Sequence, residues 1–227
     1  MKIHARLGAR GFTLLDVVAV VALLGLFAVL AFPVFVDAAG EARTRLCAGN
    51  LGQVGRAVAM YASEYNDTLP GNQHSRPSWV QSLSDYAPTN SFRCPEERVS
   101  GRGMWAFTIA LNDFLTPHPY GARELDFSKR ARVSAPGETM MFGEAREEYR
   151  AYDHFHFADA RENGYSADAF AEQVDVERHS GAANYLFMDG RVDGLDWSSA
   201  VKAKLTHQGS RFVHPGGEMR RVEVAGR

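Results

Sequence analysis

The residues whose chemistry suits a metal ion are concentrated in the C-terminal half of the chain. His154 and His156 flank a phenylalanine, so a strand at this point would place both imidazoles on one face. With His179, Glu144 or Asp189 they would offer the imidazole and carboxylate groups that zinc and similar ions bind. However, the chain has no His-Glu-x-x-His, and these histidines lie in its least patterned part. We therefore favour hydrogen-bonded or surface histidines over a metal site.

The case for a calcium site or a nucleophile rests on few residues. Asp189, Asp193 and Asp196 lie close together, but they lack the ordered ligand spacing of an EF-hand loop. Ser180 follows His179 directly, yet the chain has no Gly-x-Ser-x-Gly turn and no phosphate-binding glycine loop. We expect a protein that is not an enzyme, with no catalytic residues and no cofactor. The alternative is a metal or calcium site drawn from Asp189, Asp193, His154 and His156.

These groups follow a long apolar stretch, residues 12–36, in which Asp16 is the only ionisable side chain. The stretch exceeds the roughly 20 residues that a helix needs to cross a bilayer. The leader before it, residues 1–11, has three basic residues and no acid, which predicts a cytoplasmic N-terminus and an exported C-terminal domain. The stretch ends in the bulky residues 33–36, where a signal peptide would be cleaved after a small residue, so we expect the chain to stay in the inner membrane. The basic residues are Lys2, Arg6 and Arg10.

Length and charge limit the partners of the chain. Its 227 residues have room for one anchor and one globular domain. The formal net charge is −2, and it becomes −5 once the three basic residues of the leader are removed. Because an acidic chain is a poor match for phosphates, we expect no nucleic-acid partner.

Two cysteines, Cys47 and Cys94, follow the apolar stretch. In an oxidising exported compartment, an even pair of cysteines favours a disulfide. Cys47 also lies on an apolar helix stripe, where a free thiol packs as a small hydrophobic side chain. We predict the disulfide and keep the free, packed thiol as the alternative.

The apolar stretch begins Gly-Phe-Thr-Leu-Leu-Asp, from Gly11 to Asp16, and this resembles the signature of type IV prepilins and type II secretion pseudopilins. In that family a prepilin peptidase cuts after the glycine and methylates the new N-terminal residue. The resemblance implies cleavage between Gly11 and Phe12 with methylation of Phe12, and a helix kink at Pro33. It also implies that Asp16, in place of the usual glutamate, pairs in a filament with a neighbour's N-terminal amine. A lone carboxylate in a membrane helix costs about 2.5–3.5 kcal/mol, which is a physical reason to expect a partner.

A second motif lies near the C-terminus, where His179 is followed by nine residues and then by Asp189 and Gly190. This spacing resembles a motif of a large bacterial family of prepilin-type proteins that carry the same N-terminal segment. Shorter matching phrases around the two cysteines lie between the two motifs. The resemblance therefore covers most of the chain, although it does not extend to residues 145–178 or to the tail after Trp197.

A single helix is predicted from Phe12 to Tyr65. Its first half is apolar on all sides, and residues 37–66 continue it in amphipathic form. Turn formers and a proline follow it, which predicts the end of the helix. The apolar stripe on the second half consists of Cys47, Leu51, Val54, Val58, Tyr61 and Tyr65.

The globular part, residues 67–227, is less regular. Residues 78–86 predict a short helix capped by its first serine, and residues 139–142 predict a strand. Residues 183–195 predict a hairpin with a two-residue Asp-Gly turn. Residues 145–178 are polar and acidic, which predicts a long and irregular surface excursion.

Together these patterns predict an α+β fold in which a long N-terminal helix packs on a C-terminal antiparallel β-sheet, as in pilins. The resemblance implies a structural subunit of a type IV pilus-like or type II secretion pseudopilus filament. Its partners would be copies of itself or related pilin subunits, the prepilin peptidase and the inner membrane, and its final location a cell-surface or periplasmic filament. The alternative is a membrane-anchored extracytoplasmic domain that binds a ligand or acts as a metal-dependent enzyme.

Overall fold

The computed structural model describes most of the chain, and all structural statements below concern the described residues. These are residues 11–74, 77–97, 107–117, 126–149, 151–157, 166–205 and 210–216. The chain divides into two compact units, Met1–Ala42 and Arg43–Arg227. The three basic residues of the predicted leader, Lys2, Arg6 and Arg10, lie outside the described residues.

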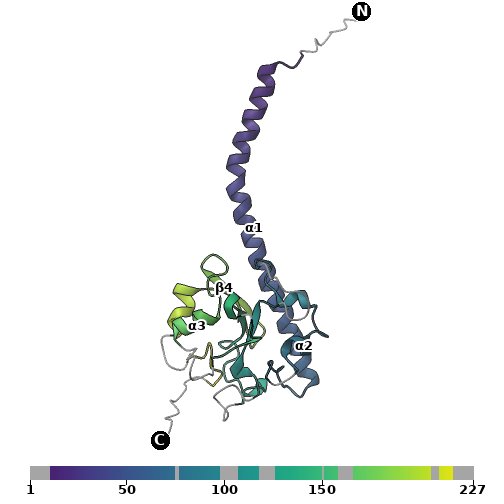
Figure 1. The fold of residues 1–227 in the computed structure, drawn as a ribbon, viewed down its shortest axis with the longest axis vertical. Helices are drawn as coiled ribbons and strands as arrows, with labels where there is room; N and C mark the ends of the chain where they lie inside the picture. The colour runs from purple at the N-terminus through teal and green to yellow at the C-terminus, as the bar shows by residue number, and fades with distance from the viewer. Residues whose placement is uncertain are drawn as a thin grey trace, which may run out of the picture. The chain divides into compact units, whose positions relative to one another are not determined.

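Helix α1, Leu14–Glu64, has 51 residues and confirms the predicted long helix (Figure 1). At its start Thr13 and Asp16 form a capping box: the Thr13 N–H and hydroxyl both donate to Asp16 Oδ2, at 2.9 and 2.7 Å. The helix continues through Pro33 without a break. It ends where Asn66 and Asp67 turn into the left-handed region, with φ of 55° and 61°.

The first part of α1, up to Ala42, belongs to the first unit. All of its large apolar side chains from Leu14 to Val36 are exposed. None of its most apolar stretch is buried, and this part is long and apolar enough to cross a membrane.

The second part of α1 carries the predicted apolar stripe. The buried residues confirm Cys47, Leu51, Val54 and Val58, whereas Tyr61 is half-buried and Tyr65 is exposed. The stripe packs against the globular sheet so closely that a Cβ on Gly55 would lie 2.9 Å from Leu186 Cδ1. Glycine at this position therefore allows the helix to contact strand β4, Ala182–Phe187.

The sheet has five strands among the described residues, in the order β3-β1-β2-β4-β5. Neighbouring strands are antiparallel except β1 and β3, which are parallel, so the predicted antiparallel sheet is in fact mixed. The parallel pair arises because the chain leaves β2 and passes to the far side of β1 before it forms β3. The strands are β1 Ile109–Asn112, β2 Met140–Glu144, β3 His154–Phe155, β4 Ala182–Phe187 and β5 Val192–Asp196.

Strands β4 and β5 form the predicted hairpin, with a different turn. The Phe187 N–H donates to the Arg191 carbonyl at 2.8 Å, and the Gly190 N–H donates to the Phe187 carbonyl at 3.0 Å. The loop therefore has three residues, 188–190, rather than two. Gly190 has φ of 89°, which matches the glycine position that closes loops of this length.

Each face of the sheet has its own hydrophobic core. Alternate residues of β4 face the two cores in turn. Leu186 faces the core that α1 covers, and Tyr185 and Phe187 face the core on the other side of the sheet. The second core includes Phe155 and Phe170, so residues 145–178 are wrongly predicted as a surface excursion. Their aromatic side chains are spaced too irregularly for a periodic pattern, but the fold buries them.

Short helices connect these elements. Helix α2, Trp79–Leu83, is shorter than predicted, and Ser78 caps it as predicted by accepting from the Val80 N–H. The others are α3 Ala167–Gln173, α4 Lys202–Leu205, the 3₁₀ turns η1 Thr89–Phe92, η2 Asp113–Leu115, η3 Arg130–Arg132 and η4 Glu147–Tyr149, and the π-helical turn η5 Trp197–Val201.

Candidate metal centre

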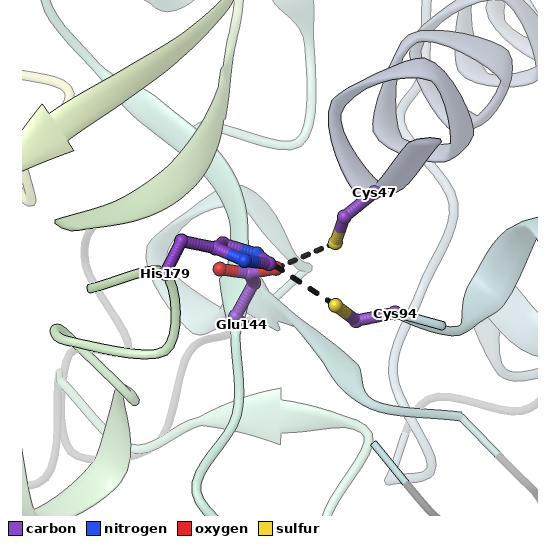
Figure 2. Close-up of side chains that lie close together, drawn as sticks. All are labelled: Cys47, Cys94, Glu144 and His179. Atoms are coloured by element: carbon purple, nitrogen blue, oxygen red, sulfur yellow. Dashed lines mark hydrogen bonds and ion pairs between the residues drawn. The ribbon is translucent and has the colours of Figure 1, made fainter. Parts of the chain in front are cut away.

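Four side chains from distant parts of the chain meet between α1 and the sheet (Figure 2). They are Cys47 of α1, Cys94 after η1, Glu144 at the end of β2, and His179 before β4. All four are buried, and their ligand atoms lie within 4.8 Å of one another. We refer to these four residues as the Cys-Glu-His cluster.

Local structure fixes each member of the cluster. Cys47 lies on the buried stripe of α1. The Cys94 N–H donates to Thr108 Oγ1 at 2.6 Å, which holds its loop against the start of β1. The Asn184 N–H donates to Glu144 Oε2 at 3.0 Å and so orients that carboxylate.

His179 is placed by a tight turn before β4. Its backbone forms a bridge with Ala182, and the two residues between them, Ser180 and Gly181, have φ of 56° and 92°. Left-handed backbone is unusual for serine. Because both residues adopt it, the chain reverses its direction within two residues. The imidazole is thereby directed towards Glu144 and Cys94, as Figure 2 shows.

Direct hydrogen-bond distances connect the four side chains. The Cys47 thiol donates to Glu144 Oε1 at 2.6 Å, and His179 Nε2 lies 2.9 Å from the same oxygen. His179 Nε2 also lies 3.7 Å from Cys94 Sγ. On the other side of the ring, His179 Nδ1 lies 3.2 Å from Thr44 Oγ1 and 3.4 Å from a carboxylate oxygen of Glu96.

Electrostatics inside the cluster favour charged groups. Burial lowers the pKa of His179, but hydrogen bonds with Cys94 and Glu144 outweigh it and raise the pKa to about 10. Burial raises the pKa of Glu144, but the His179 hydrogen bond and the nearby guanidinium of Arg178 bring it below its usual value. The site therefore holds an imidazolium and a carboxylate in contact.

The two thiols titrate as a pair. The neighbouring Cys47 thiol, assisted by His179, lowers the pKa of Cys94 to about 6. The neighbouring Cys94 thiol, burial and the Glu144 carboxylate raise the pKa of the Cys47 thiol. The pair therefore releases its first proton readily, from the sulfur beside the imidazole, and its second with difficulty.

Both cysteines are free in the structure. The predicted disulfide between Cys47 and Cys94 is therefore not formed here, although the two sulfurs face one site. The sequence patterns predict a bond between the two cysteines and group Glu144 and His179 with other histidines. One signal could have joined the two groups: both cysteines and His179 belong to the short sequence motifs on which the family resemblance rests.

The other predicted histidines form a separate group. His154 and His156 lie with His74, and the ring centroids of His154 are 4.7 and 4.9 Å from those of His156 and His74. His154 is buried and its Nδ1 lies 2.8 Å from Asp153 Oδ1, while His74 is exposed. Burial lowers the pKa of His154 despite that carboxylate. We call this group the histidine trio.

The candidate calcium ligands do not converge. Asp189 Oδ1 accepts from the Arg191 N–H at 3.0 Å, inside the hairpin turn, and the Arg191 guanidinium pairs with Asp193. Asp196 instead caps the π-helical turn by accepting from the Ser199 N–H at 2.8 Å. These three carboxylates are occupied by local contacts, and none of them approaches the Cys-Glu-His cluster.

Comparison with known proteins gives no assignment of this chain or its site: no family matches it, and no curated protein and no solved structure matches it. The chemistry of the site must therefore be inferred from its geometry.

The geometry is that of a closed set of ligands. Two sulfurs, one carboxylate oxygen and one imidazole nitrogen surround a single buried point. Catalytic zinc sites keep one position for water or substrate, whereas structural sites use four protein ligands. The Cys-Glu-His cluster has the four protein ligands of the structural kind.

Proposed function

We propose that this chain is a membrane-inserted structural subunit of a type IV pilus-like or type II secretion pseudopilus-like filament. The observation that carries the proposal is the first part of α1, which exposes a continuous apolar surface from Leu14 to Val36 with one carboxylate, Asp16, at its start. In a lone soluble chain this surface would face water. A bilayer covers it before assembly, and neighbouring helices cover it in a filament.

The position of Asp16 supports a filament rather than a plain anchor. An anchor needs no carboxylate in its apolar part, and this one costs about 2.5–3.5 kcal/mol in a bilayer. Thr13 already donates two hydrogen bonds to Asp16 Oδ2, so the carboxylate is held at the helix start. After cleavage between Gly11 and Phe12, a neighbour's terminal amine would lie near the same end of the helix and neutralise it.

The globular part agrees with this use. The second part of α1 packs on a mixed sheet, which gives an α+β domain attached to the membrane-competent helix. We propose in addition that this α+β domain has a pilin-like fold. A contact between one surface of a helix and a different surface of its neighbour does not close on itself, and such contacts build filaments.

A membrane-anchored enzyme is the second candidate, because the Cys-Glu-His cluster could hold a metal ion. Its burial argues against catalysis. None of the four side chains is more than 7% exposed, and four protein ligands leave a tetrahedral ion no position for substrate.

The test is the mass of the mature N-terminus. We expect the purified protein to begin at a methylated Phe12, and Gly11→Val to retain the leader and remain unassembled. Gly25→Val is the matched control, because a Cβ at Gly25, as at Gly11, meets no atom within 4 Å. An assembled protein that begins at Met1 or Lys2 would contradict the proposal.

A further inference from the structure

We propose that Cys47, Cys94, Glu144 and His179 bind one zinc ion in a closed tetrahedral site that joins helix α1 to the sheet. The inference is independent of the proposed filament function, because it concerns how the globular part is held together. It replaces the predicted disulfide with a different link between the same two cysteines.

The ligand set matches zinc in chemistry, and its four ligand atoms lie close together in the fold. Thiolate, imidazole and carboxylate are the three side-chain groups that zinc takes in proteins, and paired sulfurs with an imidazole favour zinc over calcium or magnesium. Zinc bond lengths place tetrahedral donor atoms about 3.3–3.8 Å apart. Here Glu144 Oε1 lies 2.6 Å from Cys47 Sγ and 2.9 Å from His179 Nε2, His179 Nε2 lies 3.7 Å from Cys94 Sγ, and all four ligand atoms lie within 4.8 Å. The Glu144 carboxylate must therefore move away from the sulfur and the imidazole as the ion enters between them.

The surrounding hydrogen bonds are those of ligands held in orientation. Zinc-binding histidines usually donate their second ring nitrogen to an oxygen, which fixes the ring. His179 Nδ1 faces Thr44 Oγ1 and Glu96 Oε2, at 3.2 and 3.4 Å. Glu144 Oε2 is held by the Asn184 N–H, which leaves Oε1 facing the site.

The loop of Cys94 is also tied to α1. Asn50 Nδ2 donates to the Arg93 carbonyl at 2.8 Å, and Arg43 Nε lies 3.1 Å from Glu96 Oε1. These contacts set the two sulfur-bearing segments side by side before any ion binds. A preorganised pair of segments lowers the cost of assembling the four ligands.

An acidic depression offers a route to the site. It has a volume of about 290 Å³ and is lined by Glu96, Glu97, Glu147, Asp175 and Arg178. Four of these five residues are carboxylates, and such a concave surface raises the local concentration of cations. Glu96 lines the depression and also lies 3.4 Å from His179 Nδ1, so the depression reaches a residue that contacts a proposed ligand.

A disulfide is the competing state of the same cysteines. It would account for two of the four side chains, but it would leave the buried Glu144 carboxylate and His179 beside a neutral bridge. A zinc ion accounts for all four. The two states differ in thiol count, mass and metal content, so one preparation distinguishes them.

The experiment uses the full chain, purified in detergent without reductant or added metal. We expect one zinc ion per chain by elemental analysis. We also expect two thiols that react with a thiol reagent only after a strong chelator is added. The chelated protein, given Co²⁺ alone, should show tetrahedral d–d bands and a sulfur-to-cobalt charge-transfer band.

Variants test the ligands and their support. Glu144→Gln keeps the side-chain volume and should weaken zinc binding more than Thr44→Val, which should weaken it about tenfold through the loss of ring orientation. His74→Gln, in the histidine trio, is the matched control and should leave zinc binding unchanged. If Glu144→Gln does not fold, the cobalt spectrum of the unaltered chain still tests the sulfur ligands.

Three results would overturn the proposal. The first is a metal-free chain that is lighter by two hydrogens, which would show the disulfide. The second is a metal-free native chain whose two thiols react at once. The third is a bound ion that is lost in His74→Gln and retained in Glu144→Gln, which would place the metal at the histidine trio. None of these results bears on N-terminal processing.

Discussion

The two parts of α1 belong to one helix but differ in what surrounds them. From Leu14 to Val36 every large apolar side chain is exposed, and from Cys47 to Ala62 an apolar stripe is buried against the globular core. The distribution of apolar residues around the helix explains this difference in burial. The first part is apolar on all sides, and the second has one apolar side. A helix that is apolar all round needs a cover on all sides, which the globular part of one chain does not supply.

This comparison separates two kinds of stability. Substitutions in the second part should change the free energy of unfolding of the globular unit. Substitutions in the first part should leave it unchanged and act on membrane insertion or assembly. The predictions below are ordered by their expected effect on the globular unit.

The largest effect is expected from Val54→Asp. Val54 is 0% exposed in the core beside the sheet, and an unpaired charge there should cost about 3–5 kcal/mol. Chemical denaturation of the detergent-solubilised chain, followed by tryptophan fluorescence, measures the loss. Val29→Asp is the matched control, because Val29 is 71% exposed on the same helix. It should leave the unfolding midpoint unchanged and reduce the membrane-bound fraction; equal destabilisation by the two variants would refute the distinction.

An intermediate effect is expected from Gly55→Val. The new Cβ would lie 2.9 Å from Leu186 Cδ1, and such overpacking should cost about 1–3 kcal/mol. Gly49→Val is the control on the same part of the helix, because a Cβ at Gly49 meets no atom within 4 Å. The thermal midpoint of the globular unit should fall for the first variant and stay or rise for the second. A fall of the same size in both would show that the contact with β4 does not set the effect.

No effect on the globular unit is expected from Asp16→Ala. The variant should insert into membranes at least as well as the unaltered chain, because a charge is removed from hydrocarbon. It should form far fewer filaments, since the neighbour's amine loses its partner, whereas Asp16→Glu should assemble. Filament counts by electron microscopy measure this. Normal numbers of Asp16→Ala filaments would show that the carboxylate serves only as the helix cap with Thr13.

Local patterns predicted the parts of the fold that depend on local physics. The 3.6-residue period and the turn formers after Tyr65 predicted α1 nearly to the residue. Ser78 predicted the cap of α2, and Asp189 and Gly190 predicted the β4-β5 hairpin, although not its three-residue loop. Each of these features is stabilised by contacts between residues that are close in sequence.

Long-range features were missed for the same reason. The parallel pairing of β3 with β1 and the burial of Phe155 and Phe170 depend on where the chain returns to the sheet. The Cys-Glu-His cluster depends on four segments at once, and nothing in the spacing of Cys47 or Cys94 points to Glu144. The sequence patterns therefore indicate every member of the cluster but place them in two different sites.

The spread of the cluster along the chain sets the order in which it can form. Cys94 and His179 are 85 residues apart, and at synthesis rates of about 5–20 residues per second the histidine follows the cysteine by roughly 4–17 s. During the first part of that interval the two thiols have neither their carboxylate nor their imidazole, and after Glu144 has been synthesised they still lack the imidazole. A chain that stops before residue 179 would keep both thiols without His179, so the completed site marks a subunit that has been synthesised and folded through β4.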